Sequence, residues 1–291
     1  MTRKKTSKKK STKRDPERIE RNKKIALGTA ISIGAAGVFV GGAFGVGELD
    51  RRAAEFVVPG HAQVIINWPT NSQGKGWMPI NERERIALLL SRSVQGGKAL
   101  SRAPLEEAGL ALMRTGWIQG TPTVTWTSEG QISLESTWRV PVAVVREGSR
   151  EYLIDQDPKV LPLDYAIGES NQFFFVNADA HLPEVGEQWL GTDLQDGLEL
   201  LQILTQEGLL EQIAGFDLGK DAESGTIRIL TRNDGRIIWG AGPGRERPGE
   251  VPTSVKIERL NAVFNRTGLI DGGSEFIDIR GSDILFQRRE G

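Results

Sequence analysis

The stretch GWIQGTPTVTWTSEGQISLESTWRVPVA, residues 116–143, carries the pattern of a β-hairpin. Apolar and polar residues alternate on both sides of the turn signal Ser128-Glu129-Gly130. Alternation with a period of two is typical of strands that bury one face. The alternating apolar residues are Val124, Trp126, Ile132 and Leu134. We therefore predict two antiparallel strands in this stretch.

Upstream of this hairpin, the spacing of apolar residues predicts two amphipathic helices. Asn81 is the expected N-cap of the first helix, with Glu84 in the capping-box position. Pro104 is expected to open the second helix. The two apolar faces consist of Ile86, Leu89, Leu90 and Val94, and of Leu105, Ala108, Leu112 and Met113. With a strand beginning at Val64, the predicted order is strand, helix, helix, strand, strand.

Downstream of the hairpin, strand patterns predominate. A second hairpin is predicted from Thr226–Thr231, the turn Asn233-Asp234-Gly235 and Arg236–Trp239. Further strands are expected at Phe173–Val176, Phe276–Arg280 and Ile284–Arg288, and further helices at Asp193–Ile213 and Thr253–Arg266. The body is therefore predicted to be α+β, in two units that comprise residues 48–145 and 146–291.

Charge is distributed unevenly along the chain. Residues 1–24 hold 12 Lys and Arg against 3 Asp and Glu, a net charge of +9, whereas the remainder carries −10. The basic leader is typical of a disordered tail, and attachment to nucleic acid or to anionic lipid is the alternative interpretation. Since phosphate contacts need clustered Lys and Arg, we expect the acidic body to bind no nucleic acid.

Residues 25–47 form a run of 23 residues without a charged side chain. As a helix this run reaches about 34 Å, enough to cross a hydrocarbon core of about 30 Å. We expect an uncleaved transmembrane helix, with a cleaved signal peptide and a buried core helix as alternatives. Lys23 and Lys24 precede the run and predict a cytoplasmic N-terminus and an extracytoplasmic body.

Small residues recur at four-residue spacing within the predicted span. Gly37, Gly41 and Gly45 fall on one helical stripe, which lets a second helix backbone approach closely. These glycines are therefore candidates for lateral helix pairing in the membrane.

The composition argues against several chemistries. The absence of cysteine excludes disulfides and thiolate sites, and His61 and His181 do not have metal-ligand spacing. The glycine-rich run at 240–244 lacks the Lys-Ser/Thr ending of a P-loop, and no Gly-x-Ser-x-Gly elbow occurs. We therefore predict no catalytic residue, no metal and no cofactor, and expect that the chain is not an enzyme.

Five short motifs in the body follow one another in a recognisable order. They are Gly116-Trp117-Ile118, Arg139-Val140-Pro141-Val142-Ala143, Leu153-Ile154-Asp155, Leu182-Pro183 with Gly186, and Ile277-Asp278-Ile279-Arg280. These motifs resemble those of the FtsQ/DivIB cell-division proteins and occur in the family's order, and the basic tail with a single span matches the family's layout. The resemblance implies a POTRA-like module of order β-α-α-β-β, followed by a C-terminal mixed β-sheet domain with flanking helices.

The resemblance also implies a scaffold of the division machinery in the cell inner membrane at the septum. Its partners would be of the FtsB/FtsL type and would add a strand beside the C-terminal strand. Partner binding is expected at Arg280, Ile284, Leu285, Phe286, Gln287 and Arg288. Arg280 would pair with an acidic partner residue.

Other interpretations of these features stay open at this point. The C-terminal residues also fit an ordinary terminal strand with a surface arginine. The chain as a whole also fits another envelope protein with a POTRA-type module, such as a secretion or assembly component, or a hydrolase with an unrecognised site.

Overall fold

The computed structural model describes residues 63–70, 74, 76–94, 102–219 and 225–287. The predicted tail at 1–24, the predicted span at 25–47 with Gly37, Gly41 and Gly45, and the predicted partner-binding residue Arg288 lie outside these residues. Within the described part of the chain, no helix is long and apolar enough to cross a membrane. Four α-helices and two mixed sheets make this part α+β, as predicted.

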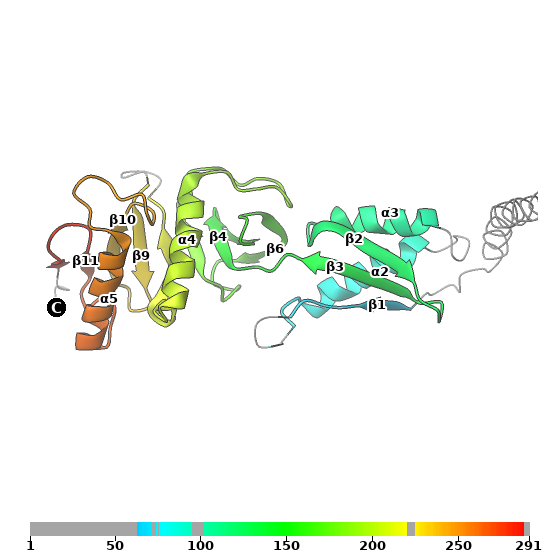
Figure 1. Cartoon of the computed structure of the whole chain (residues 1–291), viewed down its shortest axis with the longest axis horizontal. Helices are drawn as coiled ribbons and strands as arrows, with labels where there is room; N and C mark the ends of the chain where they lie inside the picture. The colour runs from blue at the N-terminus through cyan, green and yellow to red at the C-terminus, as the bar shows by residue number, and fades with distance from the viewer. Residues whose placement is uncertain (1–62, 71–73, 75, 95–101, 220–224, 288–291) are drawn as a thin grey trace, which may run out of the picture. The chain divides into compact units, whose positions relative to one another are not determined.

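The first sheet has three strands and the predicted order of elements. β1 (Val64–Ile66) pairs in parallel with β3 (Ile132–Trp138), and β3 pairs antiparallel with β2 (Ile118–Trp126). The chain passes through α2 (Ile80–Val94) and α3 (Arg102–Met113) between β1 and β2 (Figure 1). The predicted order of strand, helix, helix, strand, strand is confirmed.

The start of α2 differs from the prediction. The helix begins at Ile80, and the carbonyl of Pro79 accepts the amide hydrogens of Glu82 and Arg83 at 3.2 and 3.1 Å. Asn81 therefore lies inside the helix, and its prediction as the N-cap was wrong. The proline carbonyl takes the place that the asparagine side chain was expected to fill.

Glu82 is the buried acid of α2, whereas the predicted capping-box residue Glu84 is exposed. The Glu82 carboxylate accepts the indole N–H of Trp117 at 2.7 Å and forms an ion pair with Arg85. Burial raises the pKa of Glu82, but the hydrogen bonds from Arg85 and Trp117 outweigh it, so the pKa lies below its ordinary value. Glu82 therefore ties α2 to the chain that enters β2.

The second sheet has nine strands in the order β12-β11-β10-β9-β8-β7-β4-β5-β6. The strands are β4 (Ala143–Glu147), β5 (Arg150–Ile154), β6 (Val160–Ala166), β7 (Phe174–Val176), β8 (Ile213–Asp217), β9 (Ile227–Thr231), β10 (Arg236–Gly240), β11 (Phe276–Asp278) and β12 (Leu285–Gln287). β7 pairs in parallel with β4 and β8, and β10 pairs in parallel with β11. The predicted boundary between residues 145 and 146 falls within β4, which pairs along its whole length with β5.

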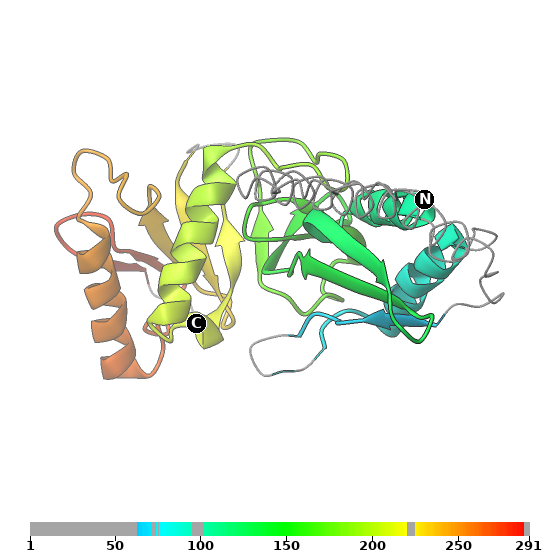
Figure 2. The same cartoon turned by 45° about the vertical axis from the view of Figure 1, so that its right-hand side comes forward.

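Two helices lie side by side on one face of the nine-stranded sheet (Figures 1 and 2). α4 (Thr192–Gln206) connects β7 to β8, and α5 (Thr253–Thr267) connects β10 to β11. Both connections join parallel neighbours and progress in the same direction along the sheet, so right-handed crossovers place both helices on the same face. Gly197 lets α4 approach the sheet closely, because a Cβ there would lie 2.7 Å from the ring of Phe175.

The helix predicted over residues 193–213 is shorter in the structure. Gly208 has a φ of 72°, and the N–H of Leu209 donates to the carbonyl of Leu204 at 3.0 Å. This is a Schellman motif, which ends α4 and satisfies its last carbonyls. A short 3-10 helix, η1 (Leu210–Gln212), leads into β8. The prediction of a helix that continues to residue 213 was wrong, because leucines keep the helical spacing beyond the point where α4 ends.

β4 and β5 are buried on both faces. Ala143 and Val145 belong to the core that also contains the buried leucines of α4. Val144 and Leu153 belong to a second cluster, which includes Trp117 and buried residues of α2 and α3. Successive residues of a strand point to opposite faces, so β4 serves both clusters. Apart from Arg102, the described residues accordingly form one compact unit.

Replacing Glu82 by alanine would leave the buried N–H of Trp117 without its acceptor. We expect the free energy of unfolding to fall by about 1–3 kcal/mol, the cost of an unsatisfied buried polar group. Urea denaturation followed by tryptophan fluorescence measures the change. Glu84→Ala, on the exposed part of the same helix, is the matched control and should cost less than about 0.5 kcal/mol. Equal losses in the two variants would contradict the role of Glu82.

Candidate partner-binding edge

β12 is the terminal strand of the nine-stranded sheet and pairs with β11 alone among the described strands. An edge strand keeps one row of backbone N–H and C=O groups without a strand partner. Leu285 and Phe286 are 63% and 52% exposed, although both are large and apolar. Exposed backbone groups and apolar side chains therefore occur together on this edge.

The structure places three of the six predicted partner-binding residues on this edge. Leu285, Phe286 and Gln287 form β12, and all three are exposed. Ile284 lies just before the strand, where it is half-buried and packs against the core of the nine-stranded sheet. Ile284 therefore anchors the strand, and the three residues after it are available to a partner.

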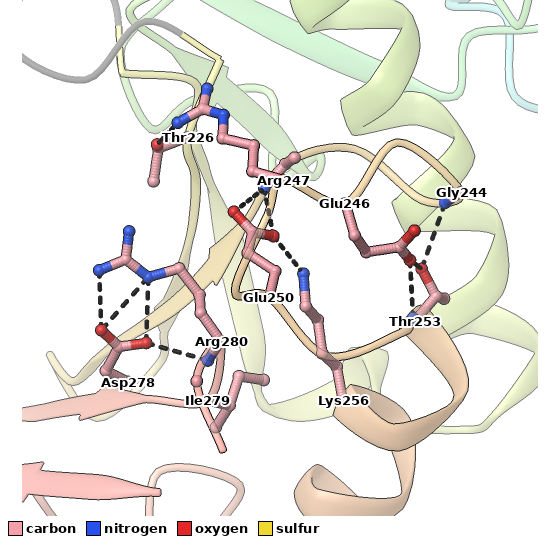
Figure 3. A network of polar contacts seen from close by, with 12 residues as sticks. Thr226, Gly244, Glu246, Arg247, Glu250, Thr253, Lys256, Asp278, Ile279 and Arg280 are labelled. Atoms are coloured by element: carbon pink, nitrogen blue, oxygen red, sulfur yellow. Dashed lines mark hydrogen bonds and ion pairs between the residues drawn. The ribbon is translucent and has the colours of Figure 1, made fainter. Parts of the chain in front are cut away.

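Arg280 lies two residues after the end of β11 and is paired within the chain (Figure 3). Its guanidinium donates to the carboxylate of Asp278, with the shortest contact at 2.8 Å, and its backbone N–H donates to the same carboxylate at 2.9 Å. Burial raises the pKa of Asp278, but the hydrogen bonds from Arg280 outweigh it and hold the pKa below its ordinary value. An acidic partner residue would therefore have to share Arg280 with Asp278 or displace it.

Arg259 on α5 stabilises the loop between β11 and β12 by hydrogen bonds to its backbone carbonyls. One terminal guanidinium nitrogen of this α5 residue donates to the carbonyls of Ile279 and Gly281 at 2.8 and 2.6 Å. The other donates to the carbonyl of Ser282 at 2.6 Å. Arg259 was not predicted from the sequence, because its partners are backbone carbonyls, which residue types do not reveal.

A buried ion pair fixes the loop that leads from β10 into α5 (Figure 3). The Nζ of Lys256 is 2.8 Å from the carboxylate of Glu250, and both side chains are almost completely buried. Glu250 also accepts the backbone N–H of Ala241 at 3.1 Å, and Nζ of Lys256 lies 5.2 Å from the centre of the Trp239 ring. Removing one member of such a pair leaves an uncompensated buried charge, so the pair determines the path of the loop.

The start of α5 is fixed by a second carboxylate in the same loop (Figure 3). Glu246 accepts the backbone N–H and the hydroxyl of Thr253 at 2.7 and 2.6 Å. These hydrogen bonds lower the pKa of Glu246 to about 2. Further along, the N–H of Val251 donates to the carbonyl of Arg280 at 2.8 Å. The loop before α5 and the loop after β11 are thus joined directly.

A further acidic side chain of this region, Asp271, has a structural partner. The carboxylate of Asp271 is buried and accepts the hydroxyl of Thr231 at 2.6 Å. Among the described residues, no group of His, Asp and Glu is arranged to hold a metal ion. Comparison with models of protein families finds no match, and comparison with curated proteins finds no significant one.

Arg259→Met should loosen the β11–β12 loop, because methionine keeps a long unbranched side chain but lacks the guanidinium. We expect the amides of residues 279–287 to exchange about tenfold faster, because charge-assisted hydrogen bonds to three carbonyls are lost. Hydrogen exchange of the full chain read by mass spectrometry measures this. Arg266→Met, an exposed position on the same helix, is the control and should leave exchange unchanged. Unchanged exchange in Arg259→Met would contradict the proposed role of Arg259 in ordering this loop.

Proposed function

We propose that this protein is a single-pass membrane scaffold of the cell-division machinery, which docks FtsB/FtsL-type partners by strand addition to β12. The observation that carries the proposal is the exposed terminal edge formed by Leu285, Phe286 and Gln287. Strand addition takes its affinity from main-chain hydrogen bonds and its specificity from the side chains beside them. β12 offers both kinds of contact.

The contacts that order β12 within the chain also support strand addition as the mode of partner binding. A partner strand binds with less loss of entropy when the receiving edge is already ordered. Arg259 orders the loop before β12, and Ile284 anchors the strand to the core. The partner would therefore meet a prepared edge rather than a segment that must fold on binding.

The first sheet supports assignment of a POTRA-like module. Its order of β1, α2, α3, β2 and β3 is the order that the family resemblance implies, and β1 pairs in parallel with β3. In the proposed scaffold this module is a second docking surface, and residues 25–47 anchor the body to the inner membrane at the septum. The alternative of a different envelope protein shares the module but not the need for an FtsB/FtsL-type partner.

Phe286→Pro should abolish capture of the FtsB/FtsL-type pair by the full chain, because proline removes a backbone donor from the strand and disturbs its pairing. Phe286→Tyr keeps the backbone N–H and the aromatic ring and should bind as the unmodified chain does. Pull-down with the purified coiled-coil pair measures both variants. Unchanged capture by Phe286→Pro would rule out docking at β12. Failure of the unmodified chain to capture the pair would favour the different envelope protein.

The membrane anchor is tested separately. The full chain should remain in the membrane pellet after extraction with alkaline carbonate, because an apolar helix of about 20 residues or more stays in the hydrocarbon core. Deletion of residues 25–47 should move the body to the supernatant. Immunoblotting of the two fractions measures the distribution, and a soluble full chain would contradict the proposed anchor.

A further inference from the structure

A groove of about 650 Å³ runs beside α4 in the nine-stranded domain. Its floor is apolar and its rim consists mainly of amide side chains. The floor is formed by Leu198, Leu201, Leu210, Phe173 and Val142, and the α4 rim by Gln195, Glu199, Gln202 and Gln206. From Gln195 to Gln206, the groove follows about 16 Å of helix at about 1.5 Å per residue.

The extent of the groove favours an elongated occupant. Its lining along α4 covers about three helical turns, which matches an amphipathic helix laid into a groove. Four rim or wall residues carry amide groups, which donate and accept hydrogen bonds without requiring a charged ligand. They are Gln156, Gln195, Gln202 and Gln206. The floor accordingly suits the apolar face of a helix, and the rim suits its polar flanks.

The acidic residues of this region favour an occupant with a positive charge. Residues 160–219 contain eleven Asp and Glu and not a single Lys or Arg. Among the described residues that line the groove, Glu199 is the one charged residue, and Glu207 follows at the end of α4. Neither carboxylate forms an ion pair within the described part of the chain, whereas Asp196 on the same helix is paired with Arg245. Unneutralised acids beside an apolar floor complement a basic partner.

We propose that the α4 groove binds a basic amphipathic helix of a partner protein, with large apolar side chains on its buried face and Lys or Arg beside them. Anionic lipid is disfavoured because Glu199 and Glu207 would repel it. The chain's own basic tail at 1–24 is disfavoured because its large apolar residues are limited to Met1 and Ile19. These two arguments favour a segment from a different protein as the occupant.

This site is separate from the β12 edge. β11, β10, β9 and β8 lie between β12 and β7, so about 24 Å of sheet separates β12 from β7 at about 4.8 Å per strand. The groove borders the start of β7 through Phe173 and the η1 turn through Leu210. Binding at the groove thus goes beyond the proposed strand addition and does not depend on it.

The test uses the full chain in nanodiscs of zwitterionic lipid and a fluorescein-labelled Leu/Lys peptide of about 16 residues, long enough to form a helix. Its leucines follow helical spacing. One comparison peptide has Glu in place of Lys, and another has the Leu/Lys composition in shuffled order. Fluorescence anisotropy, with empty nanodiscs as the blank, should show binding of the Leu/Lys helix about tenfold or more tighter than either comparison peptide.

Variants then locate the binding site. Glu199→Lys combined with Gln202→Lys should weaken binding of the Leu/Lys helix about tenfold, because both positions are exposed on the groove rim. Glu258→Lys, exposed on α5, is the matched control and should leave the affinity within about twofold, since added charge away from the site is screened.

Three outcomes would overturn the proposal. These are equal affinity for the three peptides, equal affinity of the double variant and the unmodified chain, and concentration-dependent self-association that the double variant abolishes. The last outcome would assign the groove to a second copy of this chain. Circular dichroism of the double variant verifies that the fold is retained, so a loss of binding is attributable to the groove.

Discussion

The parallel pairing of β10 with β11 is the constraint on which the exposed edge depends. Two parallel neighbours cannot be joined by a tight turn, so the chain must leave the sheet, cross one face and return. α5 makes this crossing. The crossing brings the helix against the loop that follows β11, where Arg259 reaches three carbonyls. The terminal strand is thus ordered from the core side, and no other described strand pairs with its outer side.

Buried charges in this domain define the paths of loops. A buried ion pair adds little net stability compared with apolar packing, but removal of one member is costly. Lys256 and Glu250 fix the entry to α5, and the buried pair of Arg139 and Asp155 fixes the turn after β5. Asp155 also accepts the N–H of Lys159 at 2.9 Å. In both cases a carboxylate satisfies backbone donors in a loop as well as a cation, so the ion pair and the loop conformation form together.

Sequence patterns predicted the elements whose signals are local. The hairpin at Asn233-Asp234-Gly235 follows from turn chemistry, and α5 from its apolar period; both are present in the structure. The end of α4 was mispredicted because Gly208 interrupts leucines that keep the helical spacing. The start of α2 was mispredicted because the Pro79 carbonyl competes with Asn81 as the cap. In each error a backbone group decided a boundary that side-chain patterns do not report.

Side-chain patterns are visible in a sequence, whereas contacts to backbone groups are not, and this difference explains why the candidate edge was predicted and Arg259 was not. An alternating strand near the chain end is visible in side chains, and the structure forms β12 at Leu285–Gln287. The guanidinium of Arg259 binds backbone carbonyls, which every residue has, so no residue type in the sequence indicates these contacts.

The α4 groove was missed because its walls come from segments far apart in sequence, which only the folded sheet brings together. The two surfaces also differ in what they recognise. β12 offers backbone groups that any extended segment can satisfy, so its selectivity must come from flanking side chains. The groove offers an apolar floor and a rim of amide side chains with one acid, Glu199, so its selectivity would come from shape and charge. Under the two proposals, an extended segment at β12 and a helix in the groove would bind simultaneously, because neither mode of binding uses the other's contacts.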